Sequence, residues 1–244
     1  MTVPGKLKLV KDTVPDIIRT NLTLNLDPLD QPSSSGSTLY DLTGNNPATL
    51  HNSPTHNSDI GYYDYNGTDQ YLTVSEPLLT GADDFTYEIW FNLDTISGYF
   101  GSNTAAKLLC HPVSNGAEIF ITSLSNGTPY NLYWKRSVVL FGPVWNCSAA
   151  ISNGSWHQLV LTQDNTNGGT VVYINGVSTF TDATFQYTSW AAPVGDTYLL
   201  GDFSTSPPNA EVNGKVGEIR AYNAVLTAAE VANNFNARRW RYGL

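Results

Sequence analysis

Two glutamates are the side chains in this sequence best placed for acid–base chemistry. Glu88 and Glu218 each lie in a segment that alternates like a β-strand, so they could converge from separate strands. Cleavage of a glycosidic bond needs two carboxyl groups about 5–9 Å apart. However, no glutamate falls in an E-x-D-x-x-E-type cluster, and Glu218 beside Arg220 is typical of a solvent-facing ion pair. We therefore expect no catalytic residues and a protein that is not an enzyme.

Aromatic rings in expected loops are the second group that could do chemistry, because such rings stack on sugars. Trp145, Tyr187 and Trp190 are our candidate carbohydrate-binding residues, and Tyr99 and Trp134 also lie in or near loop-like segments. Core packing is the competing explanation for any one ring, since aromatic residues make up 12% of the chain.

Oxygen ligands for calcium are plentiful, but no spacing selects among them. His51 and His56 flank Pro54 in a polar stretch that a turn explains better than a metal. We expect no cofactor and leave calcium open. The possible calcium ligands are Asp64, Asp69, Asp164 and Asp202.

The charge of the chain argues against nucleic acid as a partner. Its net charge is −9, whereas phosphate binding needs clustered lysines and arginines. The one basic cluster consists of Arg238, Arg239 and Arg241. We interpret it as favourable placement at the negative end of a terminal helix, with docking on an acidic partner as the alternative.

Two further features bear on the compartment. Residues 1–20 contain no apolar segment of the secretory type, and no run approaches the roughly 20 apolar residues of a membrane span. We therefore expect synthesis and use without classical export and no membrane partner. Cys110 and Cys147 are the only cysteines, and we expect two buried free thiols in preference to one disulfide.

Short alternating strands must position these side chains. The run at residues 21–27 places Leu22, Leu24 and Leu26 on one face and predicts the first strand, after an N-terminal arm at residues 1–20. We expect the arm to pack on its own domain or on a neighbouring subunit.

A central strand is predicted between Phe85 and Leu93. Its apolar row is expected to face the core, and its other row, which includes Glu88 and Trp90, is the side that we expect to meet solvent or ligand. The predicted core row is Phe85, Tyr87, Ile89, Phe91 and Leu93.

Turn and cap signals delimit other elements. Asn66-Gly67 and Asn175-Gly176 supply the positive φ angles of tight hairpins. Thr227 and Glu230 match a capping box, which predicts a helix over roughly residues 228–239 with Val231 and Phe235 on its buried side. Further strands are predicted at Lys107–Cys110, Ile119–Ser123, Leu132–Trp134, Trp156–Thr162, Thr170–Ile174 and Val177–Phe180.

Six ordered segments resemble the concanavalin A-like lectin/glucanase superfamily in its laminin G-type branch. They are YDYNGTDQYLTV at 63–74, FTYEIWFNL at 85–93, GSWHQLVLTQD at 154–164, VVYINGV at 171–177, YLLGDF at 198–203 and GKVGEIRAYNAVLTAAEV at 214–231. The resemblance implies an all-β, two-sheet antiparallel jelly-roll sandwich spanning residues 21–244, closed by one short C-terminal helix.

A narrower resemblance links the chain to virion proteins of tailed bacteriophages that carry this fold. It rests on NLTLNLD at 21–27, LYDLTGNN at 39–46 and NNFNARRWRYGL at 233–244. It implies a capsid-decoration or fibre protein that displays a lectin-like domain, located on the virion. The arm would bind other virion proteins or a second copy of the chain in a homo-oligomer, and a glycan is a possible ligand. A free carbohydrate-binding lectin and a glycoside hydrolase are the alternatives.

Overall fold

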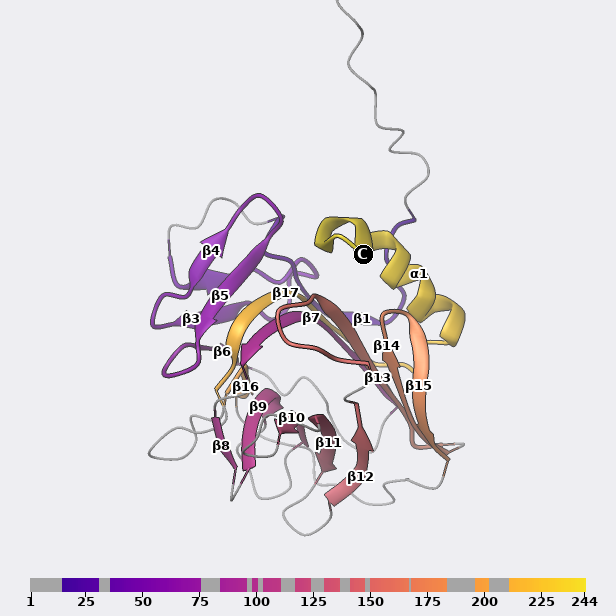
Figure 1. Cartoon of the computed structure of the whole chain (residues 1–244). Coiled ribbons are helices and arrows are strands. Elements are labelled where there is room, and N and C mark those ends of the chain that lie inside the picture. The colour runs from indigo at the N-terminus through magenta and orange to yellow at the C-terminus, as the bar shows by residue number, and fades with distance from the viewer. Residues whose placement is uncertain are drawn as a thin grey trace, which may run out of the picture.

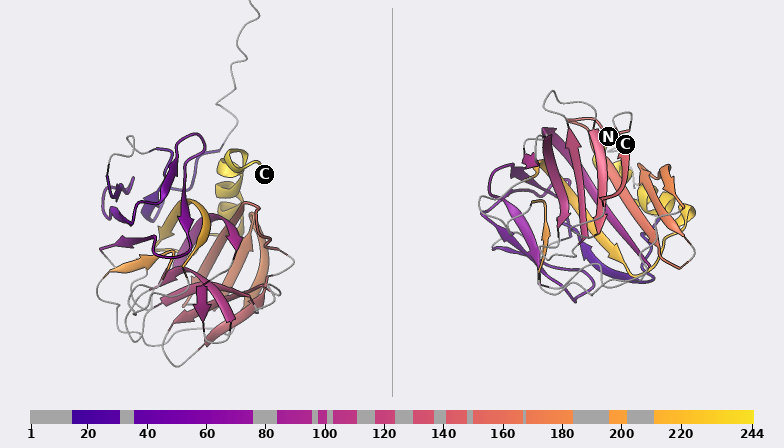
Figure 2. Two further views of the ribbon diagram at one scale, coloured as in Figure 1. Left: turned by 60° about the vertical axis from the view of Figure 1, so that its left-hand side comes forward. Right: turned by 90° about the horizontal axis from the view of Figure 1, so that it is seen from below.

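The protein folds as two antiparallel β-sheets packed face to face, with one helix across the outer face of one sheet (Figure 1 and Figure 2). This confirms the predicted sandwich. The computed structural model describes residues 15–30, 36–75, 84–95, 98–100, 103–110, 117–123, 130–136, 141–147, 150–166, 168–183, 196–201 and 211–244.

The first sheet, sheet A, has eight strands in the order β15-β14-β13-β7-β17-β5-β4, with β1 paired to β17. Its central strands β7 and β17 run side by side over most of their length. The strands are β1 (Leu22–Leu26), β4 (Thr55–Asn57), β5 (Tyr62–Asn66), β7 (Phe85–Thr95), β13 (His157–Asp164), β14 (Gly169–Ile174), β15 (Val177–Asp182) and β17 (Asn213–Tyr222).

The second sheet, sheet B, has nine strands in the order β12-β11-β10-β9-β16-β6-β3-β2, with β8 paired to β9. Six strands have no predicted counterpart, and four of them have only two or three residues, which is too short for alternation to be visible. These six are β2 (Thr38–Leu39), β3 (Ala48–His51), β8 (Gly98–Phe100), β12 (Phe141–Asn146) and β16 (Thr197–Leu199) in sheet B, and β4 in sheet A. The others in sheet B are β6 (Tyr71–Val74), β9 (Asn103–Cys110), β10 (Ala117–Ser123) and β11 (Tyr130–Arg136).

The core lies between the sheets and is built from the inward rows of both, including the whole predicted apolar row of β7. One expectation for β1 was wrong. Leu24 and Leu26 enter this core, but a bulge between Leu22 and Leu24 turns Leu22 to the opposite face.

The two Asn-Gly turns have different outcomes. Asn175 and Gly176 both have positive φ angles and join β14 to β15 as the predicted hairpin. The hairpin predicted at Asn66-Gly67 was wrong, because β5 pairs within sheet A and β6 within sheet B. The Asn66 side-chain oxygen accepts from the N–H groups of Thr68 and Asp69, so the turn carries the chain from one sheet to the other.

Helix α1 (Ala228–Arg238) begins at the predicted capping box and continues into a short 3-10 helix, η2 (Arg239–Tyr242). Thr227 caps the N–H of Glu230, and the Glu230 carboxylate accepts from the N–H of Thr227. Val231 is buried as predicted, and half-buried Phe235 stacks on Trp90. In the described part of the chain, no helix is long and apolar enough to cross a membrane.

Replacing Thr227 by alanine should destabilise the protein by about 1 kcal/mol, because the first turn of α1 loses its cap. Urea unfolding followed by tryptophan fluorescence measures the change. Thr227→Ser keeps the hydroxyl and should unfold like the wild type. Equal losses in the two variants would contradict a capping role.

Candidate ligand-binding cleft

The two glutamates considered for catalysis lie inside the protein. Glu88, Glu218 and Arg220 are fully buried, and Arg220 forms ion pairs with both glutamates. The expected solvent-facing pair was therefore wrong. Alternation shows which side chains share a face of a sheet, but not whether another element covers that face.

The C-terminal arginines complete a buried ionic network. Arg238 and Arg241 both pair with Glu218, and Arg241 also pairs with Asp27. Burial acts to raise the pKa of Asp27, but hydrogen bonds and the charge of Arg241 outweigh burial and hold that pKa below its ordinary value. Arg238 does lie in the last turn of α1, but neither interpretation of the basic cluster included a buried ion pair for Arg241.

The outer face of β7, expected to meet solvent or ligand, is sealed by the C-terminal segment. Trp90 is fully buried and stacks on Phe235 and Tyr242, at ring-centroid distances of 5.8 and 4.4 Å. Figure 1 shows α1 lying across this side of sheet A. Residues 15–19 reinforce the cover, since Ile17 is buried and the N–H of Ile18 donates to Asn234.

Only Trp145 of the three predicted sugar-binding residues lies among the residues that the structure describes. Trp145 is half-buried at the sandwich edge, packs against Phe180, and borders a water-sized gap of about 10 Å³. Tyr187 and Trp190 lie outside the described residues, so all three assignments stay predictions. Trp134 is a core residue, with its ring 5.4 Å from that of Phe85.

The possible calcium ligands also remain scattered. Asp64 lies in β5, Asp69 in the turn after it and Asp164 at the end of β13, while Asp202 lies outside the described residues. Among the side chains that the structure describes, no three of His, Cys, Asp or Glu gather in a metal-binding group. Cys110 and Cys147 are buried free thiols, as predicted.

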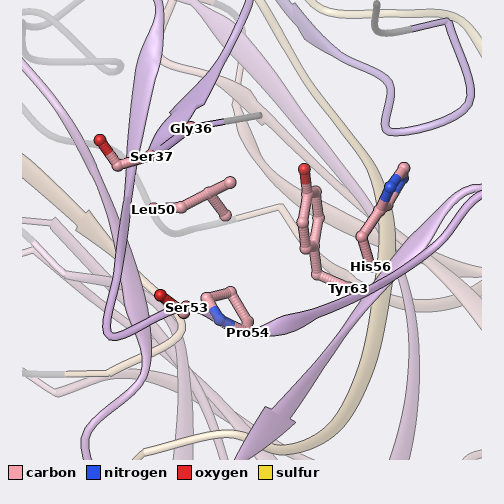
Figure 3. Close-up of a pocket in the computed structure, with 7 residues that line it drawn as sticks. All are labelled: Gly36, Ser37, Leu50, Ser53, Pro54, His56 and Tyr63. Atoms are coloured by element: carbon pink, nitrogen blue, oxygen red, sulfur yellow. The ribbon is translucent and has the colours of Figure 1, made fainter. Parts of the chain in front are cut away.

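An open cleft of about 550 Å³ lies at one edge of the sandwich, in the size range of small-ligand sites. Its described lining comes from the two residues before the edge strand β2 of sheet B, from β3 and the turn after it, and from β4 and β5 of sheet A. We call it the edge cleft. Figure 3 shows its described lining, which consists of Gly36, Ser37, Leu50, Ser53, Pro54, His56 and Tyr63.

The floor of the edge cleft is rigid. Leu50 and Tyr63 are buried members of the main core and face each other across the cleft (Figure 3). The His56 ring stacks on Tyr63 at 4.7 Å, and its Nε2 lies 3.0 Å from the carbonyl oxygen of Pro28. Because a carbonyl only accepts, Nε2–H donates there, which makes Nδ1 an acceptor in the neutral imidazole. Burial raises the pKa of Tyr63, which keeps its hydroxyl protonated as a donor.

Two interlocked turns hold the rim in place. The side-chain amide of Gln70 donates to the carbonyls of Asn52 and Ser53, and the Asn52 side chain donates to the carbonyl of Asp69. Asn52 and Ser53 have positive φ angles, so a tight bend carries the chain from β3 to β4. The Ser53 hydroxyl is therefore presented on a backbone that these hydrogen bonds hold in place.

A second surface with half-exposed rings lies on the outer face of sheet B. His51, Tyr71 and Tyr198 form a row across β3, β6 and β16, with the His51 and Tyr71 rings parallel at 4.1 Å and Tyr71 5.9 Å from Tyr198. The rings cover one another's faces, which leaves mainly their edges for a ligand. This row is therefore less suited to stacking on a sugar than an open ring would be.

The edge cleft was not predicted from the sequence. Its polar residues are single serines and a histidine in a turn-rich stretch, where no spacing marks a site. The one visible signal was the grouping of His51, Pro54 and His56, which we attributed to a turn. The cleft combines residues from strands of both sheets, and that combination is a property of the tertiary structure.

Comparison with known families supports the fold. The family model described as the concanavalin A-like lectin/glucanases superfamily matches residues 66–232, more than half of the chain. A search of curated proteins found no match.

Solved structures with the same architecture include two kinds of domain. Domain 4 of an extracellular arabinanase from Geobacillus stearothermophilus, in complex with arabinotriose, has a TM-score of 0.60 and 21% identity, and covers 88% of this chain and 98% of its own. The receptor-binding domain of a botulinum neurotoxin C/D mosaic serotype has a TM-score of 0.66 and 10% identity, and covers 91% of this chain and 52% of its own. A serotype D domain in complex with N-acetylneuraminic acid has a TM-score of 0.64 and 10% identity, with 89% and 51% covered. The chain thus spans about half of the length of the neurotoxin domains, and at these identities the likeness shows the fold alone.

Proposed function

Because this chain belongs to the concanavalin A-like lectin/glucanase superfamily, we propose that it is a non-catalytic carbohydrate-binding domain whose ligand lies in the edge cleft. The observation that carries the proposal is the cleft itself, which combines hydroxyls, an imidazole and apolar Leu50 and Pro54 in one open cavity. Such a lining suits a sugar, whose hydroxyls exchange hydrogen bonds while its C–H groups contact apolar side chains. The complex of the arabinanase domain with arabinotriose is consistent with this proposal.

Tyr63→Phe should weaken glycan binding about 3- to 10-fold, because it removes one hydroxyl at the cleft and keeps the ring in the core. Isothermal titration with arabinotriose and lactose measures the change. Tyr62→Phe is the matched control, since Tyr62 is the preceding residue of β5 and its ring contacts Trp156 instead. Equal affinities of the two variants would count against the edge cleft.

A blocking variant tests the same site without relying on one hydrogen bond. Ser37→Trp should abolish binding by filling the cleft, whereas Thr38→Trp places the same ring on a neighbouring exposed residue outside the lining. Binding that survives Ser37→Trp in a folded variant would place the ligand elsewhere.

The burial of the two glutamates supports a domain without hydrolase activity. Glu88 and Glu218 are both bound to Arg220 beneath Trp90 and α1, where a polysaccharide has no access. Polysaccharide cleavage lost in Glu88→Gln, with binding retained, would contradict this part of the proposal.

We further propose that the domain serves as a decoration or fibre component of a bacteriophage virion. The segments that carry that resemblance form one structural unit. Asp41 pairs with Leu26 of β1 and accepts from the N–H of Asn25, and Arg241 binds Asp27 at the end of β1. Co-sedimentation of the chain with purified particles tests this role. A secreted chain with a cleaved leader, absent from any particle, would favour a free lectin.

A further inference from the structure

We infer, on the basis of the proposed function, that the edge cleft selects neutral sugars and discriminates against sugars that carry a carboxylate. The inference rests on the chemistry of the cleft lining and on the charge of the segment that builds it. It specifies a ligand class that family membership leaves open.

The cleft is built from a part of the chain that has no lysine or arginine. Between Arg19 and Lys107 the sequence contains none, although it contains eleven acidic residues. Residues 36–75, which supply the whole described lining and both turns of the rim, carry four of them. The eleven are Asp27, Asp30, Asp41, Asp59, Asp64, Asp69, Glu76, Asp83, Asp84, Glu88 and Asp94.

Cations from elsewhere in the described structure neutralise this region only in part. Lys215 lies opposite Asp64 in the register of β17 and β5, but its ion pair is with Asp94, which is also one of the eleven acidic residues. Arg241 comes close, donating to the carbonyls of Ile60 and Gly61, but its charge is compensated by Asp27 and Glu218. Asp59 and Asp69 remain in exposed turns on either side of the cleft.

The described lining contains no lysine or arginine to pair with an anion. Its side-chain donors are the hydroxyls of Ser37, Ser53 and Tyr63, because the Nε2–H of a neutral His56 is already donated to the carbonyl oxygen of Pro28. An ionised carboxylate that enters this cleft would lose hydration without gaining an ammonium or guanidinium contact, and that exchange is unfavourable. A neutral sugar both donates and accepts, so it satisfies the serines, the tyrosine and the histidine.

Paired ligands test the inference. Lactose and 3′-sialyllactose differ by one sialic acid, and isothermal titration of the full chain at low salt should show at least a 10-fold preference for lactose or for neutral arabinotriose. Ser37→Lys should narrow that preference at least 3-fold by adding a cation at the cleft. Thr38→Lys adds the same charge to the next residue, outside the lining, and should leave the preference near the wild-type value.

The outcomes separate this inference from the proposed function. Equal or tighter binding of 3′-sialyllactose at a site blocked by Ser37→Trp would overturn the neutral preference and leave carbohydrate binding intact. No binding of either class, in protein that melts cooperatively, would overturn the proposed function itself. If Ser37→Lys and Thr38→Lys changed the preference for lactose equally, that preference would come from the long-range electrostatic field of the protein and not from contacts within the cleft.

Discussion

Replacing Arg220 by methionine should lower the free energy of unfolding by about 3–5 kcal/mol, or roughly 6–20 °C in Tm for a chain of this size. The guanidinium of Arg220 lies between Glu88 and Glu218, all three fully buried. Methionine would fill much of the space but leave Glu88 without a cation. The remaining partners of Glu88 are the neutral groups of Trp90, Gln158 and Asn234.

Lys215→Met is the matched control for Arg220→Met. Both residues are cations on β17, but the pair of Lys215 with Asp94 is partly exposed to solvent, and its loss should cost less than about 1 kcal/mol. Urea unfolding of the two variants, analysed with one shared m value, compares their free energies of unfolding. The double variant Glu88→Gln/Arg220→Met should recover part of the loss, because no isolated charge then remains on Glu88. Similar costs for the two single variants would mean that burial of the network contributes nothing to stability.

Tyr242→Ala should cost about 3–5 kcal/mol, since it removes a buried ring from the cover over sheet A. That ring lies 4.4 Å from the Trp90 ring and 4.5 Å from the Trp156 ring, and the Tyr242 hydroxyl accepts from the N–H of Glu218. The close fit requires glycine at position 217, where a Cβ atom would overlap the Tyr242 hydroxyl.

Two variants separate the contributions to the effect of Tyr242→Ala. Tyr242→Phe keeps the ring and leaves the N–H of Glu218 without its acceptor, so it should cost about 1–3 kcal/mol. Trp240→Ala removes a neighbouring ring that is 59% exposed and should change stability by about 0.5 kcal/mol or less. If Trp240→Ala matched Tyr242→Ala, the loss would reflect a general disturbance of η2.

Periodicity predicted the inner half of the sandwich well. The apolar row of β7 faces the core, and the helix begins at Thr227, because both features depend on residues close together in the sequence. The outer row of the same strand was misjudged. Glu88 meets Arg220 across 132 residues and Asn234 across 146, and no local pattern indicates that a helix near the C-terminus will cover this row.

The candidate site was less accessible to sequence reasoning than the fold. Aromatic content pointed to Trp145, but its ring packs at the edge of the core beside Phe180. The edge cleft is lined by residues of β3, β4 and β5 and by the residues just before β2, and β2, β3 and β4 were not predicted. The absence of lysine and arginine between Arg19 and Lys107 was visible in the sequence, but it acquires meaning only when the cleft is located within that segment.

Arg241 and Asp27 are 214 positions apart in the sequence, so their contact can form only late in the synthesis of the chain. While a ribosome is still translating, Asp27 and Glu88 can be exposed to solvent, but neither can meet its arginine before Arg220 and Arg241 emerge. Native structure in sheet A is therefore acquired after elongation has passed these codons. Nascent chains released earlier will expose the face of Trp90 and become substrates for chaperones and proteases.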